Sequence, residues 1–316
     1  MPLKDTQFSD LYLGNDGSWL SGVPGTTDPI APKPEDQEEL LALRGECEKY
    51  IKENPTKEDF RIEHAGIHYR ASVMATIVEK IFVLRRLDEK VKPLAALGIP
   101  APVIELMMKK RMTGLVVISG AFGQGKTTTA AALVAARIGA YGGVAVTIED
   151  PTEIPLHGRH GDGICYQTEV QQGGFGHACR AVARWAPSII FIGEIRDPET
   201  AIEALRASIN GKLVICTSHA DNCAMAIERI FNTASAAGAS SEDVVGMMAT
   251  GITAVIHQRL EPGPTRKNLM LEFLFMTDED ATGVRNTIRH KRFDQLKSVI
   301  QLQKNRLLSS SARQAN

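Results

Sequence analysis

The sequence of 316 residues is poor in several features that often reveal what a protein binds. Aromatic residues make up only 5% of the chain, which argues against rows of side chains that stack on single-stranded nucleic acid. Charge is balanced as well, because 36 Lys and Arg face 37 Asp and Glu. The formal net charge of -1 therefore gives no general indication of a nucleic-acid binder. No apolar run approaches the roughly 18 residues that a membrane span needs, and the polar N-terminus does not resemble a secretory signal.

Cysteine is also scarce. The chain has five cysteines, an odd number, and they are widely scattered without any C-x-x-C pair. This pattern argues against a disulfide framework and against a cysteine-rich zinc site. We therefore expect a soluble protein of a reducing compartment, without an intrinsic membrane span.

The pattern of apolar residues changes near the segment PLAALGIPAP at residues 93–102. Gly98 and two prolines would close a helical turn there, as expected at a domain boundary. We predict an N-terminal domain at residues 1–100 and a larger domain at residues 101–316. In the first, Leu40, Leu43, Cys47 and Ile51 recur at helical spacing and predict an amphipathic helix. Residues 66–74 and 77–87 are β-branched and partly alternating, which predicts two adjacent strands.

Beyond residue 114 short apolar strands alternate with helices. A helix is predicted at 126–140, and the strands are predicted at 115–120, 144–149, 188–193 and 212–218. These strands lack polar alternation, which is typical of strands buried on both faces. The pattern predicts an α/β domain whose mostly parallel sheet carries helices on both sides.

The strongest motif is GAFGQGKT at residues 120–127. It fits G-x-x-x-x-G-K-[ST], follows an apolar strand and opens a helix, which is the context that a phosphate-binding loop requires. Its glycines allow successive N–H groups to face one concavity, to which the helix N-terminus adds positive charge. Lys126 is expected to reach the β- and γ-phosphates, and Thr127 to bind Mg²⁺. The expected nucleotide-binding residues are Gly120, Ala121, Phe122, Gly123, Gln124, Gly125, Lys126, Thr127 and Thr128. ATP is expected rather than GTP, because no guanine-reading N-K-x-D segment is present.

Carboxylates follow the second of these strands, where TIEDPTE supplies Glu149, Asp150 and Glu153. The carboxyl ends of parallel strands form the ligand-binding edge of such a sheet, and hydrolysis needs a carboxylate near the attacking water. The alternative for Asp150 and Glu153 is a helix capping box that includes Pro151.

The third and fourth strands end in further candidates. The third, IIFIGE, is a Walker B pattern that ends in Glu194 and has Gly193 where Asp is usual, so the metal would rest on Thr127 and on waters held by Glu194. Asp197 is expected to cap the helix that follows. The fourth strand ends in His219, which either has a structural role or contacts the γ-phosphate.

In this order, GAFGQGKTT, TIEDPTE, IIFIGEIRD and TSHA resemble the Walker A, Asp, Walker B and His boxes of the secretion-ATPase superfamily. The segment QTEV at 167–170 resembles a further Q-x-E-[VI] element, and Arg180 and Arg184 stand where the family has an L-R-x-x-L-R stretch. SDLYL at 9–13 resembles the family's first strand.

Within the superfamily the chain is most similar to the PilT-like and DotB-like branch. It lacks the tetracysteine zinc element of the extension and type II branch, and VRNTIR at 284–289 resembles the A-I-R-N-L-I-R motif of retraction motors. An amphipathic surface helix is the alternative for that last segment.

The resemblance implies a RecA-like P-loop ATPase core with a smaller α+β, PAS-like N-terminal domain. It also implies a cytoplasmic homo-hexamer that docks on inner-membrane secretion or pilus platform proteins. Such a ring would hydrolyse ATP with Mg²⁺ to power type IV secretion, conjugation or pilus retraction. Glu194, Glu153, Glu149 and His219 would serve catalysis, and Arg70 and Arg85 would reach a neighbour's phosphates, unless these arginines are ordinary surface residues.

Two other functions fit part of the sequence. The first is a RecA-like nucleic-acid motor, for which the basic clusters at 109–111 and 289–292 are the only support, so nucleic acid is an unexpected partner. The second is a ring adaptor that binds nucleotide without hydrolysing it. The intact set of acidic residues weighs against an adaptor.

Overall fold

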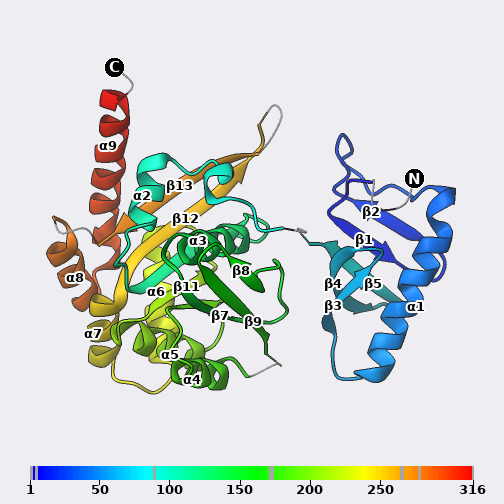
Figure 1. Cartoon of the computed structure of the whole chain (residues 1–316), viewed down its shortest axis with the longest axis horizontal. Helices are drawn as coiled ribbons and strands as arrows, with labels where there is room; N and C mark the ends of the chain where they lie inside the picture. The colour runs from blue at the N-terminus through cyan, green and yellow to red at the C-terminus, as the bar shows by residue number, and fades with distance from the viewer. Residues whose placement is uncertain are drawn as a thin grey trace. The chain divides into compact units, whose positions relative to one another are not determined.

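The computed structural model describes residues 3, 6–87, 90–170, 174–263, 267–276 and 279–314, with side chains as far as Leu307. Contacts between residues divide the chain into two compact units, which are drawn in Figure 1. The first unit comprises Met1–Lys90 and the segment Pro151–Pro155, and the second comprises Val91–Asp150 and Leu156–Asn316. The domain division that the sequence suggests, at residues 100 and 101, stays a prediction beside this division by contacts.

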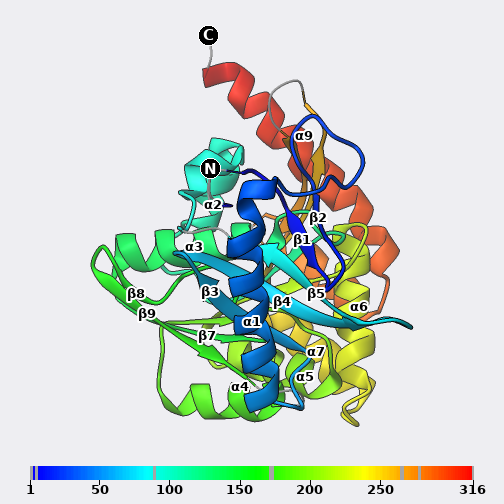
Figure 2. The ribbon, with the colours of Figure 1, turned by 90° about the vertical axis from the view of Figure 1, so that its right-hand side faces the viewer.

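The first unit is a five-stranded antiparallel sheet with one long helix across it (Figure 2). The strand order is β2-β1-β5-β4-β3. The elements are β1 Asp10–Leu13, β2 Ser18–Ser21, the 3-10 helix η2 Pro34–Asp36, α1 Gln37–Glu53, β3 Asp59–His64, β4 Ile67–Ala75 and β5 Lys80–Arg86. Leu40, Leu43 and Cys47 of α1 are buried against the sheet, which confirms the predicted amphipathic helix.

The two strands predicted at 66–74 and 77–87 are the neighbours β4 and β5. The second begins at Lys80, three residues later than predicted, because Thr76 closes a tight turn. Its hydroxyl accepts hydrogen bonds from the Val78 and Glu79 amides and donates to the Glu79 carbonyl. Strand β1 lies at the predicted first strand, whereas β2 and β3 were not predicted.

The second unit is built on an eight-stranded, mostly parallel sheet of order β13-β12-β6-β11-β10-β7-β9-β8. Its strands are β6 Gly114–Ser119, β7 Gly143–Glu149, β8 Gly158–His160, β9 Gly163–Glu169, β10 Ile189–Ile192, β11 Leu213–Ser218, β12 Ile252–Glu261 and β13 Asn268–Phe275. Only the edge strands β8 and β13 pair antiparallel with their neighbours. Every residue of β6 and β11 is buried, as predicted from their apolar sequences.

Helices cover both faces of this sheet (Figure 1). The helix α3 packs against one face, and α4 to α7 contribute to the core on the other. The helices are η3 Leu94–Leu97, α2 Ala101–Met107, α3 Lys126–Tyr141, α4 Phe175–Arg184, α5 Pro198–Ile209, α6 Cys223–Ser235, α7 Ser241–Gly251, α8 Ala281–Arg289, η4 Phe293–Gln295 and α9 Leu296–Gln314. This architecture confirms the predicted α/β core and the smaller α+β domain that precedes it.

Local signals in the sequence position several of these elements. The predicted cap of α5 is present, because the Asp197 carboxylate accepts a hydrogen bond of 2.9 Å from the Thr200 amide, a contribution of about 1 kcal/mol. All five cysteines are unpaired and buried. Burial raises the pKa of the Cys47, Cys165 and Cys179 thiols to about 12, so these side chains fill the core and are poor nucleophiles. Within the described residues, no helix combines the length and apolar character needed to cross a bilayer.

Candidate active site

The glycine loop, residues 120–127, joins the carboxyl end of β6 to the first turn of α3. Gly120 has φ 149° and Gly125, the N-cap of α3, has φ 76°, which are conformations that side chains disfavour. At Gly120 a Cβ would also lie only 2.4 Å from the Gln258 carbonyl oxygen. Two features therefore require glycine at these positions of the motif: the positive φ angles of the loop and, at Gly120, the close approach of Gln258.

A continuous chain of polar contacts runs from the glycine loop across the carboxyl edge of the sheet. The Lys126 ammonium donates to the Ala121 carbonyl at 2.9 Å and lies 3.3 Å from His219 Nδ1. On the other side of the ring, His219 Nε2 lies 3.0 Å from Glu194 Oε1. The second Glu194 oxygen accepts from Arg196 Nε at 2.7 Å. The predicted residues of the Walker A, Walker B and His boxes thus lie in direct contact.

Within this series of polar contacts, the surroundings of His219 favour its neutral form. Burial lowers the pKa of His219 from its usual 6.5; Glu194 opposes this effect, and Lys126 lowers the pKa further. With the Lys126 ammonium directed at Nδ1, the proton of the neutral ring belongs on Nε2, where it donates to Glu194. The neutral His219 ring therefore accepts from Lys126 at Nδ1 and donates to Glu194 from Nε2, so it connects the two residues through hydrogen bonds.

Phe122 and Thr127 give the loop its other accessible groups. The Phe122 ring is 80% exposed, with its centroid 3.9 Å from that of His219 and 5.7 Å from Lys126 Nζ. Thr127 lies in the first turn of α3, and its hydroxyl makes no side-chain hydrogen bond in the described part of the chain. This leaves the hydroxyl available as a metal ligand, the role that the sequence predicts for it.

Glu149, the last residue of β7, is a buried carboxylate beside the Walker B segment. Gln167 of β9 donates to its Oε1 at 3.0 Å, and the same glutamine accepts from the Leu156 and His157 amides. A Cβ on Gly193 would lie 3.3 Å from the Glu149 Cγ. Glu149 thus lies beside Gly193, where a larger side chain would require a small shift of the Glu149 side chain.

Glu153 and Arg70 are paired within the first unit. Arg70 Nη1 lies 2.9 Å from Glu153 Oε1, and Arg61 Nη1 donates to the Thr152 hydroxyl at 3.2 Å. The segment from residue 150 to 155 contains no helix, so the capping box considered for Asp150 and Glu153 is wrong. Glu153 is instead the ion-pair partner of one of the two predicted arginines.

Three arginines of the first unit form a cross-strand row. Arg61, Arg70 and Arg85 are register partners on β3, β4 and β5, and Arg85 is paired in turn with Asp10 of β1. Successive residues of a strand face opposite sides of a sheet, so Arg86 lies on the other face, where it donates to the Thr6 carbonyl. The row contains both predicted arginines and adds Arg61, which was not predicted.

Comparison with known proteins identifies the family. Residues 53–305, most of the chain, match the family described as "Type II/IV secretion system protein". The chain belongs to this family. It is 31% identical over 278 residues to the type IV pilus ATPase PilU of Pseudomonas aeruginosa, which covers 85% of this chain and 70% of that relative.

Two solved structures have the same fold. The pilus retraction motor PilT with bound ADP superposes with a TM-score of 0.74, at 28% identity and with 95% of this chain and 87% of that chain covered. DotB of Legionella pneumophila superposes with a TM-score of 0.72, at 22% identity and with 93% of this chain and 84% of that chain covered. The family match and the PilU and PilT relatives confirm the predicted secretion-ATPase resemblance and its PilT-like branch, and DotB shares the fold. The family match, PilU and PilT also confirm the prediction of an ATP-hydrolysing motor enzyme that binds nucleotide.

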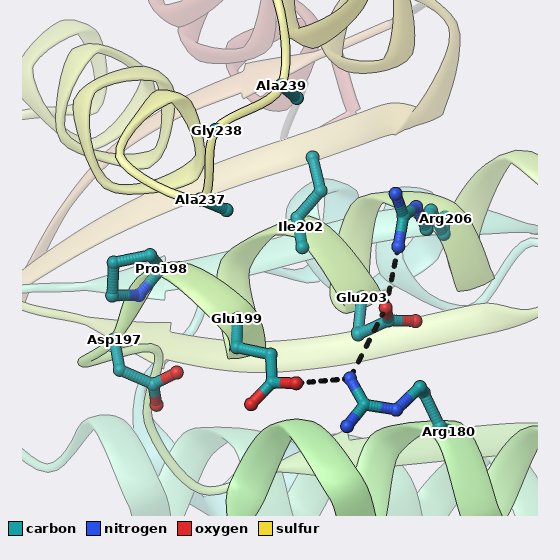
Figure 3. A pocket seen from close by; sticks show the side chains of 10 residues that line it. All are labelled: Arg180, Asp197, Pro198, Glu199, Ile202, Glu203, Arg206, Ala237, Gly238 and Ala239. Carbon is teal, nitrogen blue, oxygen red and sulfur yellow. Dashed lines mark hydrogen bonds and ion pairs between the residues drawn. The ribbon is translucent and has the colours of Figure 1, made fainter.

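In this type II/IV secretion family protein, Arg180 is not part of the series of polar contacts that runs from Lys126 through His219 and Glu194 to Arg196. It lines a cavity of about 570 Å³ between α4, α5 and the end of α6, shown in Figure 3. Arg180 of α4 pairs with Glu199 and Glu203 of α5, and Arg206 lies 2.8 Å from Glu203. Arg180, one of the two arginines that stand where the family has its L-R-x-x-L-R stretch, thus joins α4 to α5 through ion pairs.

Two residues near the predicted sites were missed. Arg61 has no local signature, because only the pairing of β3 with β4 places it beside Arg70. Gln258 of β12 donates from Nε2 to the Gln124 carbonyl of the glycine loop at 2.6 Å, although the two are 134 residues apart. No element was predicted around Gln258, and nothing in the neighbouring sequence indicated contact with the loop.

Proposed function

We propose that the protein is a Mg²⁺-dependent ATP hydrolase that works as a homo-hexamer and drives a type IV pilus or type IV secretion machine. It would act from the cytoplasm, bound to platform proteins of the inner membrane. The observation that carries the proposal is the contact chain from Lys126 through His219 to Glu194 at the carboxyl edge of the sheet. It connects a phosphate-binding lysine to a carboxylate that can act on water.

The glycine loop supplies the binding part of this function. Its curled backbone and the N-terminus of α3 favour an anion, and Lys126 would exchange its contacts with Ala121 and His219 for phosphate oxygens. The loop and the Thr127 hydroxyl fit a nucleotide with its Mg²⁺, which would be held by Thr127 and by waters on Glu194 and would neutralise phosphate charge.

The carboxylates supply the hydrolytic part. Glu194 is the proposed general base, which orients the attacking water and accepts its proton. Glu149, buried beside Gly193, would support that water or the metal's waters from the neighbouring strand. His219 contacts both Lys126 and Glu194, so a shift of the lysine towards the phosphates would change the hydrogen bonding of the base.

The arginine row supplies the proposed contribution from a neighbouring subunit. In a hexamer, Arg70 and Arg85 would reach the phosphates bound by the adjacent copy and stabilise the charge of the transition state. Glu153 would hold Arg70 in place through its ion pair. The proposed role in a type IV pilus or secretion machine is supported by the similarity to the type IV pilus ATPase PilU and to the pilus retraction motor PilT.

Glu194→Gln tests the proposal directly. The amide keeps the shape of the side chain but accepts no proton, so hydrolysis should fall by about 100-fold or more while nucleotide binding persists. Phosphate release and equilibrium nucleotide binding are the measurements, with the exposed Glu242→Gln as the matched control. Wild-type turnover in Glu194→Gln would remove this residue from catalysis.

Assembly and alternative functions can be tested in the same preparation. Specific activity should rise with protein concentration as hexamers form, which light scattering detects. A salt-dependent rise in hydrolysis with single-stranded DNA would instead favour a nucleic-acid motor. Absence of turnover in the assembled wild-type ring would favour a non-hydrolysing adaptor.

A further inference from the structure

The strand β12 extends beyond its neighbour β6 and continues alongside the glycine loop. Pairing between the two strands ends at Ser119 and His257, whereas β12 continues to Glu261. The extension is supported on its other side by β13, with Gln258 opposite Leu271 and Leu260 opposite Leu269. The glycine loop therefore lies beside a fixed piece of hydrogen-bonded sheet.

Two reciprocal hydrogen bonds join this extension to the loop. Gln258 Nε2 donates to the Gln124 carbonyl at 2.6 Å, and Gln124 Oε1 accepts from the Leu260 amide at 2.5 Å. The first and last glycines of the motif also lie close to the strand, since a Cβ on Gly120 or Gly125 would meet Gln258 atoms at 2.4 and 3.4 Å. The loop is thus held at both its backbone and its side chain.

The buried environment of Gln258 indicates that packing is not its purpose. Its side chain is 1% exposed, and its Oε1 has no hydrogen-bond partner among the described residues. Burial of an unpaired amide oxygen is unfavourable, and an apolar side chain of similar length would fill the same space without that cost. What glutamine adds here is one N–H donor directed at the loop.

We propose that Gln258 is a positioning residue that, with Gln124, holds the glycine loop in its phosphate-binding curl before nucleotide arrives. The inference rests on the proposed function, because it assigns Gln258 to the binding step of that reaction. A preformed loop lowers the cost of ordering on binding. Loss of the hydrogen bond between Gln258 and the loop should therefore weaken nucleotide affinity more than it slows turnover of bound ATP.

The test is Gln258→Met, which keeps length and removes the donor. The matched control is Gln303→Met, because Gln303 of α9 is also buried and bonds the Phe275 amide and carbonyl, away from the loop. In Gln258→Met we expect the dissociation constant for a fluorescent ADP analogue and the KM for ATP to rise about tenfold. The value of kcat should change less, and the melting temperature should fall no further than in the control.

Hydrogen exchange of residues 120–125 in the nucleotide-free protein gives a readout that needs no catalysis. It should accelerate in Gln258→Met and stay unchanged in Gln303→Met. If nucleotide affinity and hydrogen exchange are unchanged in Gln258→Met, or if both variants show equal effects, Gln258 does not position the loop. The proposed function would remain intact. A wild-type protein that binds no nucleotide would overturn the proposed function, and hydrogen exchange would then still decide whether Gln258 orders the loop.

Discussion

The two sheets of this protein place their charged side chains in different ways. In the antiparallel sheet of the first unit, Arg61, Arg70 and Arg85 lie within their strands and form a row across one face. In the mostly parallel sheet of the second unit, the four central strands β6, β7, β10 and β11 carry no charged residue before their carboxyl ends.

The difference follows from what covers each sheet. The helix α1 covers one face of the first sheet, so alternate residues of its strands can carry charge on the other face. Helices cover both faces of the second sheet, where an unpaired charge would be strongly unfavourable. The chemistry of the second unit is therefore confined to residues at or just beyond the strand ends, such as Glu149, Glu194 and His219.

The strongest test of this difference between the two sheets is to place a charge inside the parallel sheet. Ile190 is 2% exposed in the middle of β10, and Ile190→Lys should destabilise the fold by about 4 kcal/mol or more, because its ammonium would lack water and a partner. Ser72→Lys, beside Asp59 on the first sheet, should change stability by only about 0.5 kcal/mol. Urea unfolding measures both, and similar values would contradict the comparison.

Lys126 tests the edge of the parallel sheet. Lys126→Ala removes the cation beside Ala121 and His219, and we expect hydrolysis to fall by about 100-fold or more. Nucleotide binding should weaken as well. Phosphate release by folded protein is the measurement, with the exposed Lys110→Ala as the control. Retained turnover would show that this edge does not carry the reaction.

Arg70 tests the row on the antiparallel sheet. If the row acts on a neighbour's nucleotide, Arg70→Ala should lower kcat in the assembled protein by about 100-fold. This is less than the roughly 1,000-fold or more lost with an arginine that acts alone in trans, because Arg85 of the row would remain. Arg86→Ala, on the opposite face of the neighbouring strand, should lower stability but keep hydrolysis per folded molecule. Mixing Arg70→Ala with Lys126→Ala offers a further check, because complementary subunits should restore part of the activity.

The smallest expected effect is a decline in hydrolysis on acidification. Since burial lowers the pKa of His219 below 6.5, the folded ring is neutral where the unfolded ring already binds a proton. The stability that depends on the neutral ring is complete above pH 6.5 and is lost as the pH falls through the lower folded pKa. The imidazolium would also repel Lys126, so activity should decline a few-fold, and less steeply in His219→Asn. Identical pH profiles would exclude this explanation.

Much of the second unit could be predicted because its signals are local. The apolar strands, the glycine loop, the cap at Asp197 and the order of the four boxes are all written in short stretches of sequence. Parallel strands end at one edge, so a list of strand-end residues already placed Lys126, Glu194 and His219 near one another. The strand β2 was harder to predict, since four residues carry little periodicity. The strand β3, DFRIEH, does alternate between polar and apolar residues, and this signal was not used.

The sequence by itself thus determined the α/β core, the family resemblance and the residues at the carboxyl edge. Only the tertiary structure decided that Gly193 leaves room for Glu149, that Arg61 joins the arginine row, and that Gln258 holds the loop at Gln124. The physical reason is that these contacts depend on which strands pair and in which register. Strand pairing is fixed by packing between distant segments, so no short stretch of sequence contains it.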